Sequence, residues 1–213
     1  MAVFIVYFFF IGFPQAKPQG SVSVSKSLGL LKYPTLLLFA FILFFQSGFE
    51  GASGSFTPKF LEDGAGMGSG AAVLSLTWFT VGMLCGRLPL GVIMKDNGTL
   101  YLYLTVALVG VAILYFDPGV TLAHLAMAMI GFGVGATYPV VLAYLGGVFR
   151  EQSGTAFSIA IFIALCGQFA FNKVVGVMFD DGGYAYFPLV LAFAVVMMML
   201  LLPVAAGTVK KKK

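Results

Sequence analysis

Six long apolar segments alternate with short polar stretches along this chain. A helix needs roughly 20 mostly apolar residues to cross the hydrocarbon core of a bilayer, and the segments are near or above that length. Their apolar runs are continuous rather than alternating with polar positions, which argues against the strands of a membrane β-barrel. We therefore predict an all-α polytopic membrane protein with six transmembrane helices. The predicted spans are residues 34–60, 70–94, 99–116, 120–149, 154–179 and 184–206.

Polar side chains are shared unevenly among these spans. The third and sixth spans contain no charged and no amide side chain, whereas the first contains Gln46 and Glu50 and the fifth contains Gln168 and Asn172. A polar side chain is costly in hydrocarbon, so it normally faces protein or water. We expect the third and sixth helices to face lipid and the polar helices to line an internal path.

Composition and the placement of charge agree with this interpretation. The chain is 60% apolar and 9% charged, whereas a soluble domain has about 25% charged residues. Basic residues favour the cytoplasmic side of a membrane, so their distribution predicts that both ends of the six-span unit lie in the cytoplasm. We interpret the lysine tail as a membrane topology anchor rather than a nucleic-acid patch, with the lipid bilayer as its partner. The basic residues on the predicted cytoplasmic side are Lys17, Lys26, Lys32, Arg87, Lys95, Arg150 and Lys210–Lys213, and the opposite loops hold Lys59, Glu62, Asp63, Asp117, Asp180 and Asp181.

The same patterns divide the chain into four regions. Residues 1–13 are apolar but too short to span, and we interpret them as the remnant of a preceding transmembrane helix. Residues 14–33 are rich in Gly, Ser, Pro and Lys, which is typical of a cytoplasmic linker. Residues 34–206 form the predicted six-helix transmembrane domain, and residues 207–213 form a basic cytoplasmic tail.

No motif of a soluble enzyme is present. The sequence contains no phosphate-binding loop, no HExxH, no CxxC and no serine-centred elbow, so we predict neither an enzyme nor a cofactor or metal site. Cys85 and Cys166 lie inside spans and are expected to be buried free thiols. His124 has no partner motif and is expected to be hydrogen-bonded or interfacial rather than a metal ligand.

The best candidate site is the polar face of the first span. Gln46 and Glu50 are four residues apart and therefore share one face of a helix. Intramembrane carboxylates are usually functional, so we expect Glu50 to bind a solute or carry a proton. The alternative is a structural carboxylate that is hydrogen-bonded to a neighbouring helix. Gln168 and Asn172 have the same spacing and can complete the hydrogen bonds to such a solute.

Other candidates are aromatic or charged. Tyr138 offers a hydroxyl at mid-depth, and Trp78 can stack on a sugar ring, although packing is the commoner role of such a tryptophan. Arg87, Lys95 and Asp96 surround the second turnaround and are candidates for a conformational gate, with a simple interfacial anchor as the alternative for Arg87.

Glycine and proline mark two of the spans. Gly48, Gly51 and Gly54 form a ridge of small residues, which permits close helix approach in membranes. The fourth span contains several glycines and Pro139, which indicates a bent helix.

These motifs together resemble the C-terminal half of a major facilitator superfamily transporter. Gly86-Arg87-Leu88, with Gly91 and Gly98, resembles the cytoplasmic signature between the second and third helices of each half, although Lys95 and Asp96 stand in inverted order. Residues 49–56 and 135–139 are similar to the sugar-transporting fucose permease branch, although the proline common in its fifth helix is absent.

The resemblance implies a six-helix bundle of two three-helix repeats, in which the first helix of each repeat lines the cavity and the third faces lipid. It implies transport by alternating access, with proton-coupled symport of a sugar or similar small polar solute, in a bacterial inner membrane. It also implies a second transporter half as partner, either a separate N-terminal half or a second copy. The alternatives are a non-transporting scaffold or assembly subunit and an inactive fragment of a transporter.

Overall fold

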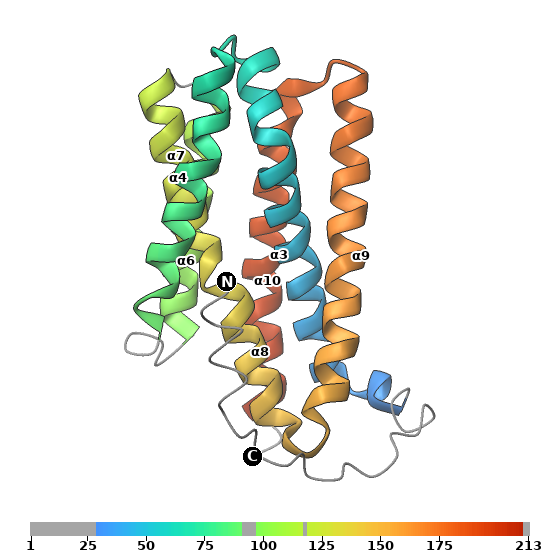
Figure 1. Cartoon of the computed structure of the whole chain (residues 1–213). Coiled ribbons are helices and arrows are strands. Elements are labelled where there is room, and N and C mark those ends of the chain that lie inside the picture. Colours follow the sequence, from blue (N-terminus) through green and yellow to red (C-terminus); the bar gives the residue numbers. More distant parts are fainter. Residues whose placement is uncertain (1–28, 91–96, 117–118, 211–213) are drawn as a thin grey trace, which may run out of the picture.

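The computed structural model describes residues 29–90, 97–116 and 119–210. Within these ranges the chain forms helices joined by short turns, and six helical stretches are long and apolar enough to cross a membrane. Figure 1 shows them as a bundle of nearly parallel rods. The main helices are α3 (Pro34–Lys59), α4 (Ser69–Arg87), α6 (Asn97–Tyr115), α7 (Val120–Gly135), α8 (Thr137–Val148), α9 (Ser153–Asp180) and α10 (Phe187–Lys210).

Within the described residues, the structure confirms an all-helical fold with six candidate spans and refines their bounds. The first span continues from α3 into a π-helix, Phe60–Gly64, and so runs beyond residue 60. α4 ends at Arg87, and Pro89 follows within two residues, while residues 91–94 of the predicted second span lie outside the described residues. The predicted bend of the fourth span is a break, because α7 ends at Gly135 and α8 begins at Thr137.

The helices associate as two groups of three. α3 packs extensively against α9 and also against α10, whereas α7 packs against α4 and α6. Figure 1 shows the α4, α6 and α7 group on the left and the α3, α9 and α10 group on the right, with α8 below and between them. The two groups also touch one another. α3 contacts α4 and α8, and α10 contacts α6.

Glycines decide how closely these helices approach. A Cβ atom on Gly82 or Gly131 would clash with the backbone carbonyl of Ala128 or Phe79, respectively, so α4 and α7 touch backbone to backbone. Only part of the predicted glycine ridge on α3 lies against a neighbouring helix. Gly48 lies against the ring of Phe171, whereas Gly54 has open space beside it.

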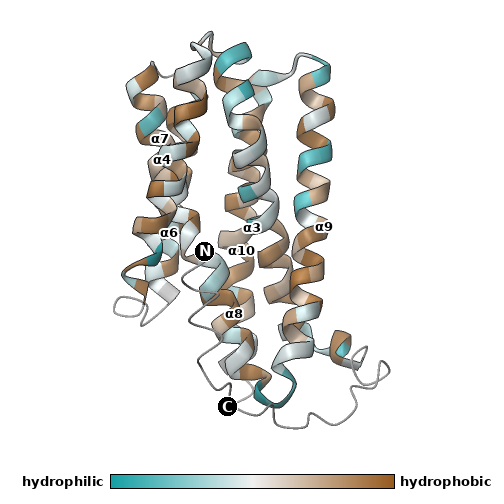
Figure 2. Ribbon diagram, viewed as in Figure 1, coloured by the Kyte–Doolittle hydropathy of each residue, from teal (hydrophilic) through white to brown (hydrophobic). Residues whose placement is uncertain are grey.

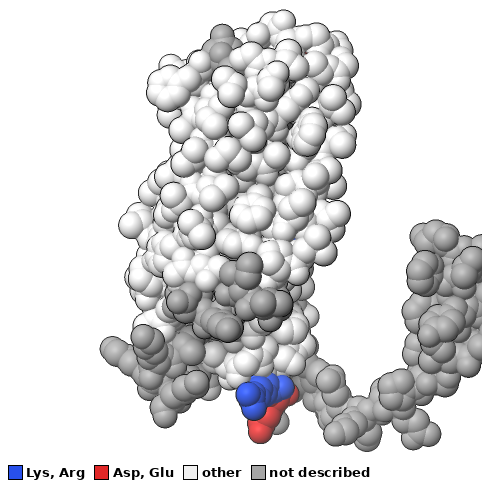
Figure 3. All heavy atoms as spheres, turned by 90° about the vertical axis from the view of Figure 1, so that its left-hand side faces the viewer, with Lys and Arg blue, Asp and Glu red and all other residues white. Residues whose placement is uncertain are grey.

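The outer surfaces of the bundle are mostly apolar. Figure 2 shows α10 as mainly hydrophobic and places hydrophilic positions on α9 and on the upper part of α3. Among the described residues on the face in Figure 3, charged side chains lie only at one end. Such surfaces fit a helical integral membrane protein, because lipid tails are as apolar as leucine. α6 and α10 each expose apolar side chains on one side, among them Leu102, Val109, Leu189, Phe193 and Leu200.

The cysteines differ from expectation. Cys85 and Cys166 are free thiols, as predicted, but both are exposed rather than buried. In a helix whose outer face is apolar, a thiol behaves as a small hydrophobe, so exposure toward lipid is tolerated.

Candidate functional site: a polar cavity between the two helix groups

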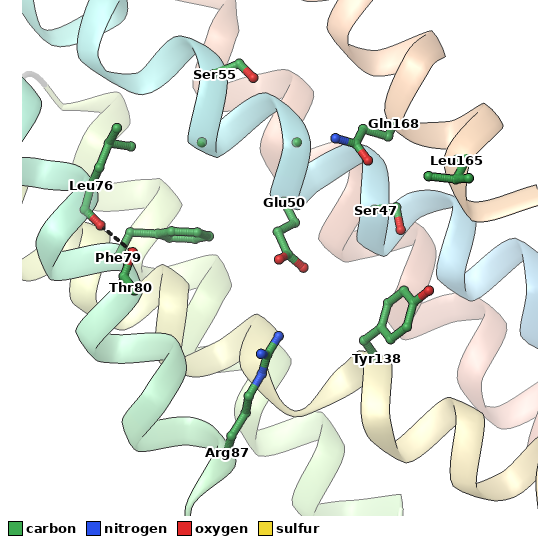
Figure 4. A pocket seen from close by; sticks show the side chains of 12 residues that line it. Ser47, Glu50, Ser55, Leu76, Phe79, Thr80, Arg87, Tyr138, Leu165 and Gln168 are labelled. Atoms are coloured by element: carbon green, nitrogen blue, oxygen red, sulfur yellow. Dashed lines mark hydrogen bonds between the residues drawn. The ribbon is translucent and has the colours of Figure 1, made fainter. Parts of the chain in front are cut away.

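A cavity of about 610 Å³ lies between the two groups of helices. Residues of α3 form one side, residues of α4 face them, and α8 and α9 each add residues (Figure 4). The lining contains a carboxylate, a guanidinium, an amide and several hydroxyls. The lining residues are Ser47, Glu50, Gly51, Gly54, Ser55, Leu76, Phe79, Thr80, Arg87, Tyr138, Leu165 and Gln168.

Glu50 occupies the middle of α3, as the sequence predicts. Its carboxylate accepts a long hydrogen bond of 3.5 Å from Nε2 of Gln46, one turn earlier on the same face. Gln46 is 1% exposed, so this amide lies behind the carboxylate rather than in the cavity. The predicted sharing of one face is confirmed, but only Glu50 lines the cavity.

Arg87 reaches the cavity from the end of α4. In Figure 4 its guanidinium and the carboxylate of Glu50 point toward one another from opposite helices. Nε of Arg87 donates a hydrogen bond of 3.1 Å to the carbonyl oxygen of Gly135. Arg87 therefore contacts the fourth span as well as the cavity, which is more than an interfacial anchor requires.

Tyr138 and Gln168 complete the polar lining. Tyr138 is the second residue of α8 and is half-buried, and Gln168 lies on α9 and is exposed. The side chain of Gln168 lies against Gly51, where a Cβ atom would come within 2.6 Å of its Cγ. The small residue on α3 thus gives Gln168 room beside Glu50.

Besides Gln46, two more predicted residues are not brought into the lining. Trp78 on α4 is 43% exposed and stacks on the ring of His124, with ring centroids 6.4 Å apart. Asn172 is half-buried on α9, and its Oδ1 is buried without a hydrogen-bond partner. Lys95 and Asp96, predicted to belong to a gate, lie outside the described residues.

His124 is hydrogen-bonded, as expected. Its Nε2 lies 2.9 Å from the carbonyl oxygen of Ala71, which ties α7 to α4. Among the residues that the structure describes, no group of three or more His, Cys, Asp or Glu side chains is arranged to hold a metal ion.

Several lining residues were not singled out from the sequence. Ser47, Ser55 and Thr80 carry hydroxyls, and Phe79 and Leu165 form the apolar parts of the wall. Ser47 and Glu50 are three residues apart and therefore on neighbouring positions of one helix face, a signal that could have found Ser47. The lining residues of α4 could not have been found in this way, because serines and threonines occur commonly in apolar helices without lining a site.

Comparisons with known proteins add no relative. No protein-family model matches this sequence. No curated protein matches it either.

Proposed function

We propose that this chain is one six-helix half of a secondary transporter that carries a sugar or a similar small polar solute together with a proton. The observation that carries the proposal is the cavity of about 610 Å³ between the helix groups, which Glu50 of α3 lines together with Arg87 and Gln168. An ionisable side chain at mid-membrane facing a water-accessible cavity is expensive and typically serves transport. Hydroxyls and the amide of Gln168 suit hydrogen bonds to a hydroxylated solute.

The helix pairings support an arrangement of two three-helix repeats. Exchanging the first span with the fourth, the second with the fifth and the third with the sixth converts the α3–α9 pair into the α7–α4 pair. The same exchange converts the α10–α3 pair into the α6–α7 pair, and all four pairs are in contact. The glycine contacts are related by the same exchange of spans. Gly167 of α9 lies against the carbonyl of Phe44, as Gly82 of α4 lies against the carbonyl of Ala128. Internal repeats with a midplane site between units are the usual construction of secondary transporters.

The cavity also needs an opposite wall. Gln168, Thr80 and Ser55 line it and are exposed. Polar side chains on an outer surface at membrane depth are costly unless protein or water covers them. The proposal therefore includes a second six-helix unit, either another transporter half or a second copy, facing this cavity in a bacterial inner membrane. A purified monomer alone is expected to carry no solute across liposomes.

Site-directed labelling tests the proposal. In a background of Cys85→Ser and Cys166→Ser, Ser55→Cys places one thiol in the cavity, and Thr105→Cys places one on the exposed side of α6 as a matched control. A water-soluble maleimide is expected to label the first and not the second. L-fucose, D-galactose or D-glucose is expected to slow the labelling of Ser55→Cys. This protection is expected to depend on pH, because Glu50 is proposed to carry the coupled proton. Glu50→Gln is expected to remove the pH dependence.

The rival function is a scaffold or assembly subunit, favoured by the glycine contacts that pack the helices. Labelling of Ser55→Cys that no sugar slows, together with unchanged behaviour of Glu50→Gln, would contradict the transport proposal and favour the scaffold.

A further inference from the structure

The break in the fourth span leaves a backbone carbonyl without its usual donor. In a continuous helix the N–H of residue i+4 donates to the carbonyl of residue i. The residue four positions after Gly135 is Pro139, which has no N–H. The backbone ladder resumes beyond the break, where the N–H of Val140 donates to the carbonyl of Ala136 at 3.2 Å.

Two other helices bind the carbonyls at this break. Nε of Arg87 on α4 donates to the carbonyl of Gly135 at 3.1 Å, which replaces the donor that Pro139 lacks. Nε2 of Gln46 on α3 donates to the carbonyl of Val134 at 3.0 Å. A buried carbonyl without a donor is costly in a membrane, so Arg87 stabilises the break by supplying the missing donor to Gly135. The carbonyl of Val134 also accepts the N–H of Ala136, so Gln46 adds a second donor there and ties α3 to the break.

Close helix packing brings Arg87 to this position. A Cβ atom on Gly135 would come within 2.7 Å of the carbonyl oxygen of Met83, one turn before Arg87 on α4. The absence of a side chain at residue 135 therefore lets the two backbones approach, and the guanidinium then needs to span only a short distance.

The first residues of α8 follow the break directly. Tyr138 lies two residues after Ala136 and lines the cavity with Glu50. Thr137, between them, is fully buried and its hydroxyl has no hydrogen-bond partner. Gln46 contacts both the break and the carboxylate of Glu50, so the break and the cavity share a residue.

We propose that Arg87 and Gln46 are positioning residues that clamp the break between α7 and α8, with Arg87 supplying the hydrogen bond that Pro139 cannot, and that this clamp fixes Tyr138 in the cavity beside Glu50. The proposal assigns Arg87 a role that an anchor at the membrane interface does not have. It does not depend on transport, because it concerns only the geometry of this chain.

A double-mutant cycle with Pro139→Ala tests the clamp. Alanine restores an N–H at residue 139, so the carbonyl of Gly135 regains a donor within its own helix. Arg87→Gln is expected to lower the Tm of the full chain in nanodiscs by roughly 5 °C, as for a lost charge-assisted hydrogen bond. In the Pro139→Ala background the same substitution is expected to lower Tm by much less. Arg150→Gln, at the exposed arginine of the 3-10 turn Arg150–Gln152, is the matched control and should have the same small effect in both backgrounds.

Equal losses from Arg87→Gln in the two backgrounds would overturn the proposal, because an anchor or a charge partner of Glu50 does not depend on residue 139. If Arg87→Gln alone fails to accumulate, the double variant is expected to recover a wild-type yield. A double variant that also fails to accumulate would count against the clamp.

A distance measurement separates positioning from general stability. Spin labels at Leu122→Cys on α7 and Gly147→Cys on α8, both exposed positions, report the angle of the break in a background of Cys85→Ser and Cys166→Ser. Arg87→Gln is expected to shift or broaden the distance distribution, and Pro139→Ala is expected to suppress that change. A distribution that Arg87→Gln leaves unaltered would contradict the clamp.

Discussion

The α4–α7 pair and the α3–α9 pair are the two most extensive helix contacts in the bundle, but they are built differently. Between α4 and α7, Gly82, Gly86 and Gly131 each face a carbonyl of the partner helix, so backbone lies on backbone. Between α3 and α9 only Gly167 does so, while Gly48 and Gly51 face the side chains of Phe171 and Gln168.

This difference separates a rigid contact from an adaptable one. Backbone cannot move aside for an added methyl group, whereas a ring or an amide side chain can change rotamer. The α4–α7 pair therefore holds the break in the fourth span close to Arg87. The α3–α9 pair, padded by side chains, carries the polar residues Glu50 and Gln168 that line the cavity.

The largest predicted effect comes from breaking the rigid pair. Gly131→Ala places a methyl group against the carbonyl of Phe79 and forces α4 and α7 apart. Overpacking of this kind costs about 3 kcal/mol of unfolding free energy. Thermal or denaturant unfolding in nanodiscs measures it. Gly147→Ala in the same span, where a Cβ atom meets nothing within 4 Å, is the control and should be neutral or slightly stabilising. Equal losses for both variants would remove the distinction.

A smaller effect is expected from the same change in the adaptable pair. Gly48→Ala meets the ring of Phe171, which is buried but also lines a cavity of about 370 Å³ together with Val174 and Phe193, so the ring has space to move. We expect a loss of about 1 kcal/mol, at the low end of overpacking costs. Adding Phe171→Leu should recover most of this loss, because a smaller side chain admits the methyl group. A loss in Gly48→Ala as large as that in Gly131→Ala would show that both pairs are rigid.

The smallest effect concerns a polar contact at the far end of the rigid pair. His124→Ala removes the contact with the carbonyl of Ala71 and the ring that stacks on Trp78. We expect a loss of roughly 0.5 kcal/mol, the low end of the net worth of one hydrogen bond, because the contact is only partly buried. Trp78 is the sole tryptophan, so its fluorescence follows this pair during unfolding. Leu122→Ala, exposed on the same helix, is the control. An unchanged emission spectrum in His124→Ala would contradict the stacking of these rings.

Local pattern was enough to predict part of the site. Glu50 was predicted because it is a lone carboxylate in an apolar span. Gln168 was predicted from its spacing to Asn172. Each prediction needed only the pattern within a single helix. Trp78 was a weaker candidate, because its place depends on how α4 packs against other helices. Sequence shows that a tryptophan lies at mid-span but does not show which side of α4 it occupies, and the structure places it beside His124.

The sequence by itself determined the class of the molecule, the existence of six apolar helices and a break-prone fourth span, because hydrophobicity and proline chemistry act within one segment. Only the tertiary structure decided which helices pair and what holds the break. The donors to Gly135 and Val134 lie 48 and 88 positions away along the chain. Such contacts arise because glycines let particular helices approach, and a glycine in the sequence does not name the backbone that it will touch.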